Sequence, residues 1–144
     1  MKVVRSILGL IVGFLVIYIV TESIEVGLVS ISSEQSMEYL MTQPMEYFKI
    51  RNTTWILVFK LFYTLFAAFL GGYLTSKIAK DLAFKTIITL SVLQGGFVIW
   101  AGFFSEMSNT GPTWMWLGLC FVLPLGIGLG HNVQSRRSQK KSGL

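Results

Sequence analysis

Charged residues are scarce in this chain of 144 residues, since Lys, Arg, Asp and Glu together make up only 13% of it. A typical soluble domain contains about 25% charged residues. Hydrophobic residues account for 53% of the chain, and its mean hydropathy is +0.64. This composition excludes an ordinary soluble globular domain and indicates a membrane protein.

Cysteine and histidine are almost absent, with Cys120 and His131 the single residue of each type. One cysteine cannot form an internal disulfide, and the chain has no Cys/His cluster with metal-ligand spacing. The sequence also has no Ser-His-Asp order and no His-Glu-x-x-His motif. We therefore expect no catalytic residues, no metal and no cofactor, and we predict that the protein is not an enzyme.

Long apolar runs occupy most of the sequence, and each can cross about 30 Å of hydrocarbon as a helix. They predict an all-α membrane protein with a bundle of four transmembrane helices as one domain, residues 1–133. A basic cytoplasmic tail, residues 134–144, is expected to be disordered because it is rich in Ser and charge. The four spans are expected at about residues 3–24, 55–76, 84–104 and 113–131.

The basic residues between the apolar runs alternate in number and so predict the orientation. The N-terminus, the second loop and the tail together contain nine Lys and Arg residues, whereas the first and third loops contain two. Cytoplasmic loops are enriched in Lys and Arg. Both termini are therefore expected in the cytoplasm, with the basic ends near anionic lipid headgroups. No nucleic-acid recognition motif accompanies the net charge of +5.

The outer side of the predicted bundle has its own signals. All four tryptophans, Trp55, Trp100, Trp114 and Trp116, lie near the outer ends of spans, where tryptophan is enriched at the membrane boundary. In the first loop, apolar residues at near-helical spacing predict one short interfacial helix, interrupted by Pro44. This helix is either a simple cover for the bundle or a lid or docking surface.

Few polar residues lie inside the apolar runs, and such groups usually face the bundle interior. Lys60 lies about 8–9 Å inside the second span, at 1.5 Å per residue. Glu22 and Glu25 share a face near the outer end of the first span, so we expect one of them to pair with Lys60. The alternative is that all three extend to the headgroups. Gln94, near the middle of the third span, completes a candidate buried polar cluster.

Glycines at helical spacing are typical of close helix contacts in membranes. Six of them are the candidate packing residues, Gly9, Gly13, Gly71, Gly72, Gly126 and Gly130. We expect the first and fourth spans to touch through their glycines at the cytoplasmic side. A functional cavity would then open on the outer side, beneath the first loop.

Residues 62–79, with Gly71-Gly72-Tyr73-Leu74-Thr75, resemble the second span of a family of small, uncharacterised bacterial integral membrane proteins with four spans. The opening Val4-Arg5-Ser6 and the residues Pro112, Trp114 and Pro124 also fit. The resemblance implies a bacterial inner-membrane protein and supplies no activity. The Met- and Glu-rich first loop departs from the family pattern.

Two functions remain open from the sequence. We expect a structural or accessory membrane subunit, acting as a homo-oligomer or within a larger membrane complex. The alternative is an oligomeric transporter of a small solute or ion that uses the candidate polar cluster. Glu25-Val26-Gly27 faintly resembles the first-span glutamate motif of small multidrug-resistance transporters, whose acid lies deeper and whose loops are shorter. A membrane-embedded enzyme ranks last.

Overall fold

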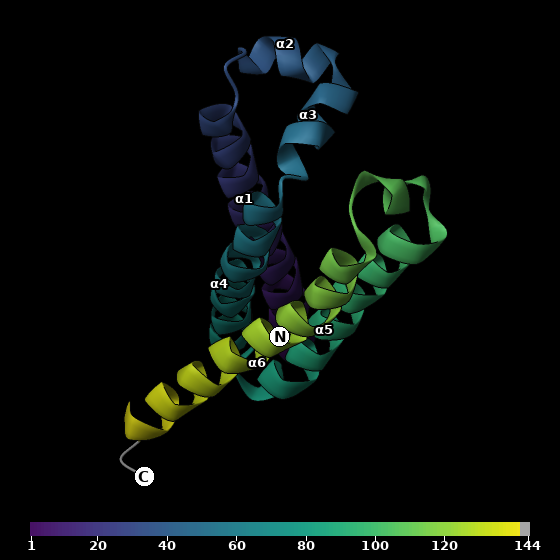
Figure 1. Ribbon diagram of the computed structural model, residues 1–144. Coiled ribbons are helices and arrows are strands. Elements are labelled where there is room, and N and C mark those ends of the chain that lie inside the picture. Colours follow the sequence, from purple (N-terminus) through teal and green to yellow (C-terminus); the bar gives the residue numbers. More distant parts are fainter. Residues whose placement is uncertain (142–144) are drawn as a thin grey trace.

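The computed structural model describes residues 1–141, and regular structure in this range is helical throughout (Figure 1). The all-α class expected from the sequence is therefore confirmed. The elements are α1 (Lys2–Ser32), α2 (Met37–Thr42), α3 (Pro44–Arg51), α4 (Thr54–Ala79), the 3-10 turn η1 (Lys80–Leu82), α5 (Ala83–Ile99), the π-helical turn η2 (Trp100–Phe104), the 3-10 turn η3 (Glu106–Thr110) and α6 (Thr113–Lys141).

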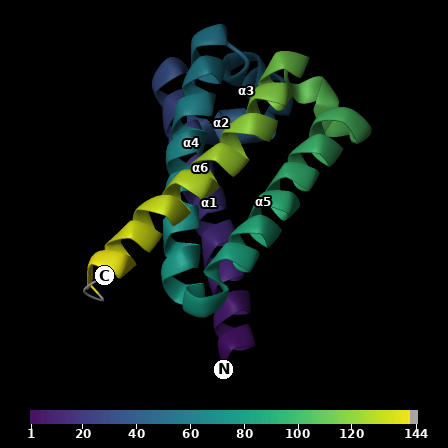
Figure 2. The same cartoon turned by 90° about the horizontal axis from the view of Figure 1, so that it is seen from below.

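Three helical segments within the described residues are long and apolar enough to cross a membrane: Lys2–Ser32, Thr54–Phe104 and Thr113–Lys140. The middle segment has 51 residues, more than twice the length that one crossing needs. It turns back at Lys80, so that α4 and α5 run in opposite directions (Figure 2). Large apolar side chains such as Phe62, Val92 and Phe121 are more than 60% exposed, as expected where lipid replaces water.

Helix α4 lies between α1 and α6 and forms the most extensive contacts with both. On one side, a Cβ on Gly13 would lie 2.0 Å from the Thr75 hydroxyl oxygen, so α1 and α4 approach closely. On the other side, a Cβ on Gly130 would lie 2.1 Å from the Phe69 carbonyl oxygen. The expected glycine contact between the first and fourth spans is therefore wrong, because Gly9 and Gly13 of α1 and Gly126 and Gly130 of α6 face α4.

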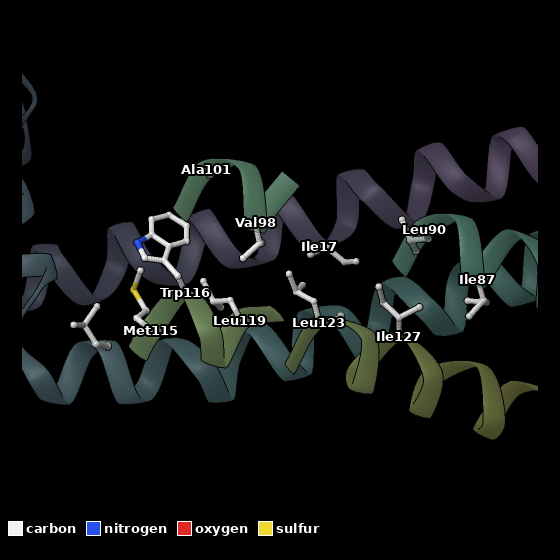
Figure 3. Packing of buried hydrophobic residues seen from close by; sticks show 12 residues of the cluster. Ile17, Ile87, Leu90, Val98, Ala101, Met115, Trp116, Leu119, Leu123 and Ile127 are labelled. Atoms are coloured by element: carbon white, nitrogen blue, oxygen red, sulfur yellow. The ribbon is translucent and has the colours of Figure 1, made fainter. Parts of the chain in front are cut away.

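The apolar core fills the space that α4 shares with α1, α5 and α6. Side chains from α5 and α6 point toward one another in it, with Ile17 of α1 beside them (Figure 3). Trp116 belongs to this core and is 7% exposed. Its ring faces the bundle interior rather than the surface, because it packs on Gly102, where a Cβ would lie 2.6 Å from the indole Cγ. The other three tryptophans are exposed.

The first loop contains two short helices, α2 and α3, in place of the single interfacial helix expected. The break falls at Gln43, and Pro44 begins α3, where its missing N–H leaves no helical bond unmade. Leu40 anchors α2 and is fully buried, whereas Met41 and Met45 are exposed. We call α2, α3 and η3 together the cap of the bundle.

The opposite end, which we call the basic end, comprises the N-terminus of α1, η1 and the C-terminal half of α6. Lys2 of α1 pairs there with Asp81 of η1 at 3.2 Å. Helix α6 continues to Lys141, so the disordered tail expected from residue 134 is wrong as far as residue 141. Arg, Lys and Gln favour helix, and cations near a helix C-terminus are stabilised by its dipole. Residues 142–144 of the predicted tail lie outside the described range.

A buried charge cluster beneath the cap

The carboxylate of Glu25 is the centre of a buried polar cluster near the cap. Glu25 is only 4% exposed, although it lies in an apolar helix. Its Oε2 atom pairs with the Lys60 ammonium of α4 and accepts a hydrogen bond from the Tyr63 hydroxyl at 3.2 Å. Lys60 and Tyr63 are three residues apart, so one face of α4 presents both donors to α1.

Arg51, the last residue of α3, brings the cap into the same cluster. Its Nη1 atom lies 3.8 Å from Oε1 of Glu25, and Arg51 is 7% exposed. Its Nη2 atom donates to the carbonyl of Thr110 in η3, which also accepts a bond from Asn52 Nδ2 at 2.7 Å. The Phe48 ring lies 4.8 Å from the guanidinium carbon. Arg51 thus ties α1, α3 and η3 together.

This cluster has one buried carboxylate and two cations, so its net charge is positive. A buried ion pair is stable only when hydrogen bonds satisfy the remaining polar atoms. Glu25 meets this condition, since Lys60, Arg51 and Tyr63 share its two oxygens. In α3, burial, followed by the negative charges of Glu25 and Glu22, raises the pKa of Tyr47 to about 12. That phenol therefore stays protonated at physiological pH.

Four buried side-chain polar atoms have no hydrogen-bond partner in the described residues: Thr21 Oγ1, Thr64 Oγ1, Arg51 Nε and Trp116 Nε1. Thr21 is one turn from Glu25 on α1, and Thr64 is one turn from Lys60 on α4. Because α1 and α4 are antiparallel, the two threonines lie at similar depth below the ion pair. Unpaired hydroxyls in an apolar interior are costly, so this level of the bundle suits a polar guest such as water.

The structure separates the four residues of the candidate polar cluster. Lys60 pairs with Glu25, which settles in this structure the choice that the sequence left open. Glu22 is exposed on α1. Gln94 is buried in α5, whereas Lys60, Tyr63 and Arg51, which contact the Glu25 carboxylate, come from α4 and α3. The sequence did not single out Arg51 or Tyr63. Tyr63 could have been found from its i+3 spacing to Lys60.

Two hollows in residues 1–141 lie at the basic end of the bundle. An outward-opening functional cavity beneath the first loop therefore stays a prediction. One of the two hollows, of about 850 Å³, lies among α4, η1, α5 and α6, and Ser76 and His131 are part of its lining. No group of three His, Cys, Asp or Glu side chains in the described range could hold a metal ion.

Comparison of the chain with protein-family models, with curated proteins and with solved structures finds no match in any of the three. Chemically, the Glu25 cluster holds three helices together through paired charges. The apolar helices define the protein as one suited to insertion in a membrane.

Proposed function

We propose that this chain is a four-span integral protein of the bacterial cytoplasmic membrane, with both termini in the cytoplasm, and that it acts as a structural or accessory subunit. Its role would be to pack against another membrane-embedded helix. The observation that supports this role best is a pair of adjacent glycines that the internal packing does not use. The resemblance to small four-span bacterial proteins agrees with this proposal and remains a prediction.

The two glycines are Gly95 and Gly96 of α5, where an added Cβ would meet no atom within 4 Å. By contrast, a Cβ at each of the six candidate packing glycines would meet a neighbouring helix at 3.0 Å or less. In membranes, small residues allow the backbones of two helices to approach closely. The exposed side chains of Leu93 and Phe97 flank the pair and would enlarge the contact with a docked helix.

The Glu25 cluster supports a structural role for the same protein. Lys60 and Arg51 are paired and mostly buried, and they connect the cap to α1 and α4. A group that must bind and release a solute needs an accessible path, whereas a structural lock needs satisfied partners. The paired arrangement favours the lock.

Gentle solubilisation followed by affinity purification tests the accessory role. A Gly96→Leu variant should lose the partner or the second copy that co-purifies with the wild type, while its thermal unfolding midpoint stays unchanged. The matched control is Gly128→Leu on α6, where a Cβ also meets no atom within 4 Å. The proposal fails if the wild type purifies as a monomer without partners, or if both variants lose the partner equally.

A transporter remains the second candidate because Thr21 and Thr64 have buried hydroxyls without a protein partner next to the ion pair. Such hydroxyls could line a hydrated path that includes Glu22, Glu25, Lys60 and Gln94. Proteoliposomes distinguish the two functions. Solute or ion uptake that Glu25→Gln abolishes and Gly96→Leu leaves unchanged would favour transport over the accessory role.

A further inference from the structure

The hollow at the basic end has a polar lining that the Glu25 cluster does not involve. It measures about 850 Å³, within the usual range for ligand sites of about 300–1,000 Å³. Its lining includes Ser76, Lys77, Lys80, His131, Ser135 and Ser138. Hydroxyls, ammonium groups and an imidazole therefore surround one space at the level where α4 ends.

A second hollow of about 490 Å³ adjoins the first, because Lys77 and Ser138 line both. It adds Arg137 and Lys140, so the combined lining has four cations. The one carboxylate in that lining belongs to Asp81, which is already paired with Lys2. The two hollows thus have a marked excess of positive charge.

A hydrogen bond between a buried serine of α4 and a histidine of α6 lies in the wall of the first hollow. Ser76 is 3% exposed, and its hydroxyl lies 2.9 Å from Nδ1 of His131. This bond fixes the imidazole between α4 and α6, and the Phe84 ring lies 6.1 Å away, centroid to centroid. With Nδ1 engaged by Ser76, Nε2 is the ring nitrogen left to meet a ligand.

Lys80 has an unusual backbone at the edge of the same hollow. Its φ is 48°. Among the non-glycine residues of the described range, Lys80 is the one with a positive φ. Such a conformation costs of order 1–3 kcal/mol for a residue with a side chain. Glycine would close this turn without that cost. Lysine at this turn therefore lowers stability, and its side chain lines the hollow. This combination favours a function for its charge.

We propose that the two hollows form a binding site for a phosphate-bearing anion, either the headgroup of an acidic phospholipid or a free phosphate compound. Ammonium and guanidinium groups make charge-assisted bonds to phosphate oxygens, and serine hydroxyls add further donors. The exposed Phe84 ring beside Lys80 is apolar surface on which an acyl chain can lie. The inference rests on the membrane placement proposed above and is independent of the accessory role.

Native mass spectrometry of the full chain in a neutral detergent tests this site. The three probes are dioctanoyl phosphatidylglycerol, dioctanoyl phosphatidylcholine and inorganic phosphate. The test variant is Lys77→Gln with Lys80→Gln. The matched control is Lys85→Gln with Lys49→Gln, which removes the same charge outside the lining. We expect the test variant to bind phosphatidylglycerol about 25-fold more weakly, fivefold per lysine, and the control to bind it normally.

A further variant, Lys80→Gly, separates binding from folding. It relieves the positive φ and removes one ammonium, so binding should fall about fivefold while the thermal midpoint does not fall. Binding of phosphatidylglycerol alone identifies a lipid site, and equal binding of inorganic phosphate identifies a free-phosphate site. Equal loss in the test and control variants would overturn the proposal, as would equal binding of phosphatidylcholine. Neither result depends on whether Gly96→Leu loses its partner.

Discussion

At the scale of single residues, Glu25 and Lys60 have unequal importance for stability, because Glu25 serves two cations. Glu25→Gln leaves both Lys60 and Arg51 without their carboxylate, whereas Lys60→Met leaves Glu25 paired with Arg51 and Tyr63. Breaking a buried ion pair by removing one partner costs about 3–5 kcal/mol. We expect Glu25→Gln to lower the thermal unfolding midpoint in detergent more than Lys60→Met does.

The control for this comparison is Glu22→Gln. Glu22 lies one turn from Glu25 on the same helix but is exposed, so its midpoint should equal that of the wild type. An unchanged midpoint for Lys60→Met would mean that the ion pair contributes nothing to folding. A double variant, Glu25→Leu with Lys60→Leu, should recover part of the stability that Glu25→Gln loses, because it removes the unpaired Lys60 ammonium and leaves only Arg51 without its carboxylate.

The sequence identified the lysine of this site and two candidate acids, but not the arginine. The depth of Lys60 in its span and of the two acids in the preceding span predicted a pair with either Glu22 or Glu25, and the structure selects Glu25. Arg51 lies in the first loop, where basic residues are ordinary, and its burial depends on α3 folding back over α1 and η3. The packing of α3 on α1 and η3 is a tertiary contact, which hydrophobic periodicity along the sequence does not predict.

At the scale of helices, the contact between α4 and α6 depends on backbone approach. A Cβ on Gly72 would lie 2.2 Å from the Ile127 carbonyl oxygen, a backbone atom that cannot rotate away. Gly72→Ala should therefore push the two helices apart and cost about 1–3 kcal/mol, as overpacking does. The measurement is the thermal midpoint in detergent.

The comparison for Gly72→Ala is Gly128→Ala on α6, where a Cβ meets nothing within 4 Å. Alanine is the better helix former by about 1 kcal/mol, so this variant should be as stable as the wild type or slightly more stable. If both alanine variants lose stability equally, close approach of α4 and α6 is not the reason that Gly72 is needed.

The apolar runs predict where the long helices lie, whereas the glycine spacing predicts a contact between the first and fourth spans that the structure does not have. The apolar runs and the turn at Lys80 are local features, and the structure has helices over all four runs. Which glycine faces which helix depends on the rotation of each helix about its axis. Gly9 and Gly13 suit either α4 or α6 equally well by composition. They face α4 because α4 lies between α1 and α6 and has small residues on two faces.

At the scale of the whole molecule, the length of α6 indicates how the chain is oriented in a membrane. Helix α6 has 29 residues and so is about 43 Å long at 1.5 Å per residue, whereas the hydrocarbon layer is about 30 Å thick. Its basic C-terminal turns therefore extend past the apolar layer, beside Lys77 and Lys80. The cap, at the other end, has only Lys49 and Arg51 as cations among α2, α3 and η3.

Single-cysteine labelling tests this orientation in intact cells. In a Cys120→Ser background, Ser36→Cys places a thiol at the start of α2, and Ser138→Cys places one in the last turns of α6. If the basic end faces the cytoplasm, as Lys and Arg residues near spans direct, a membrane-impermeant maleimide should label position 36 in intact cells. Position 138 should react only after the cells are permeabilised. Labelling of position 138 from outside would reverse the orientation and would place the phosphate site on the outer surface, where the proposed contact with cytoplasmic anionic lipid could not occur.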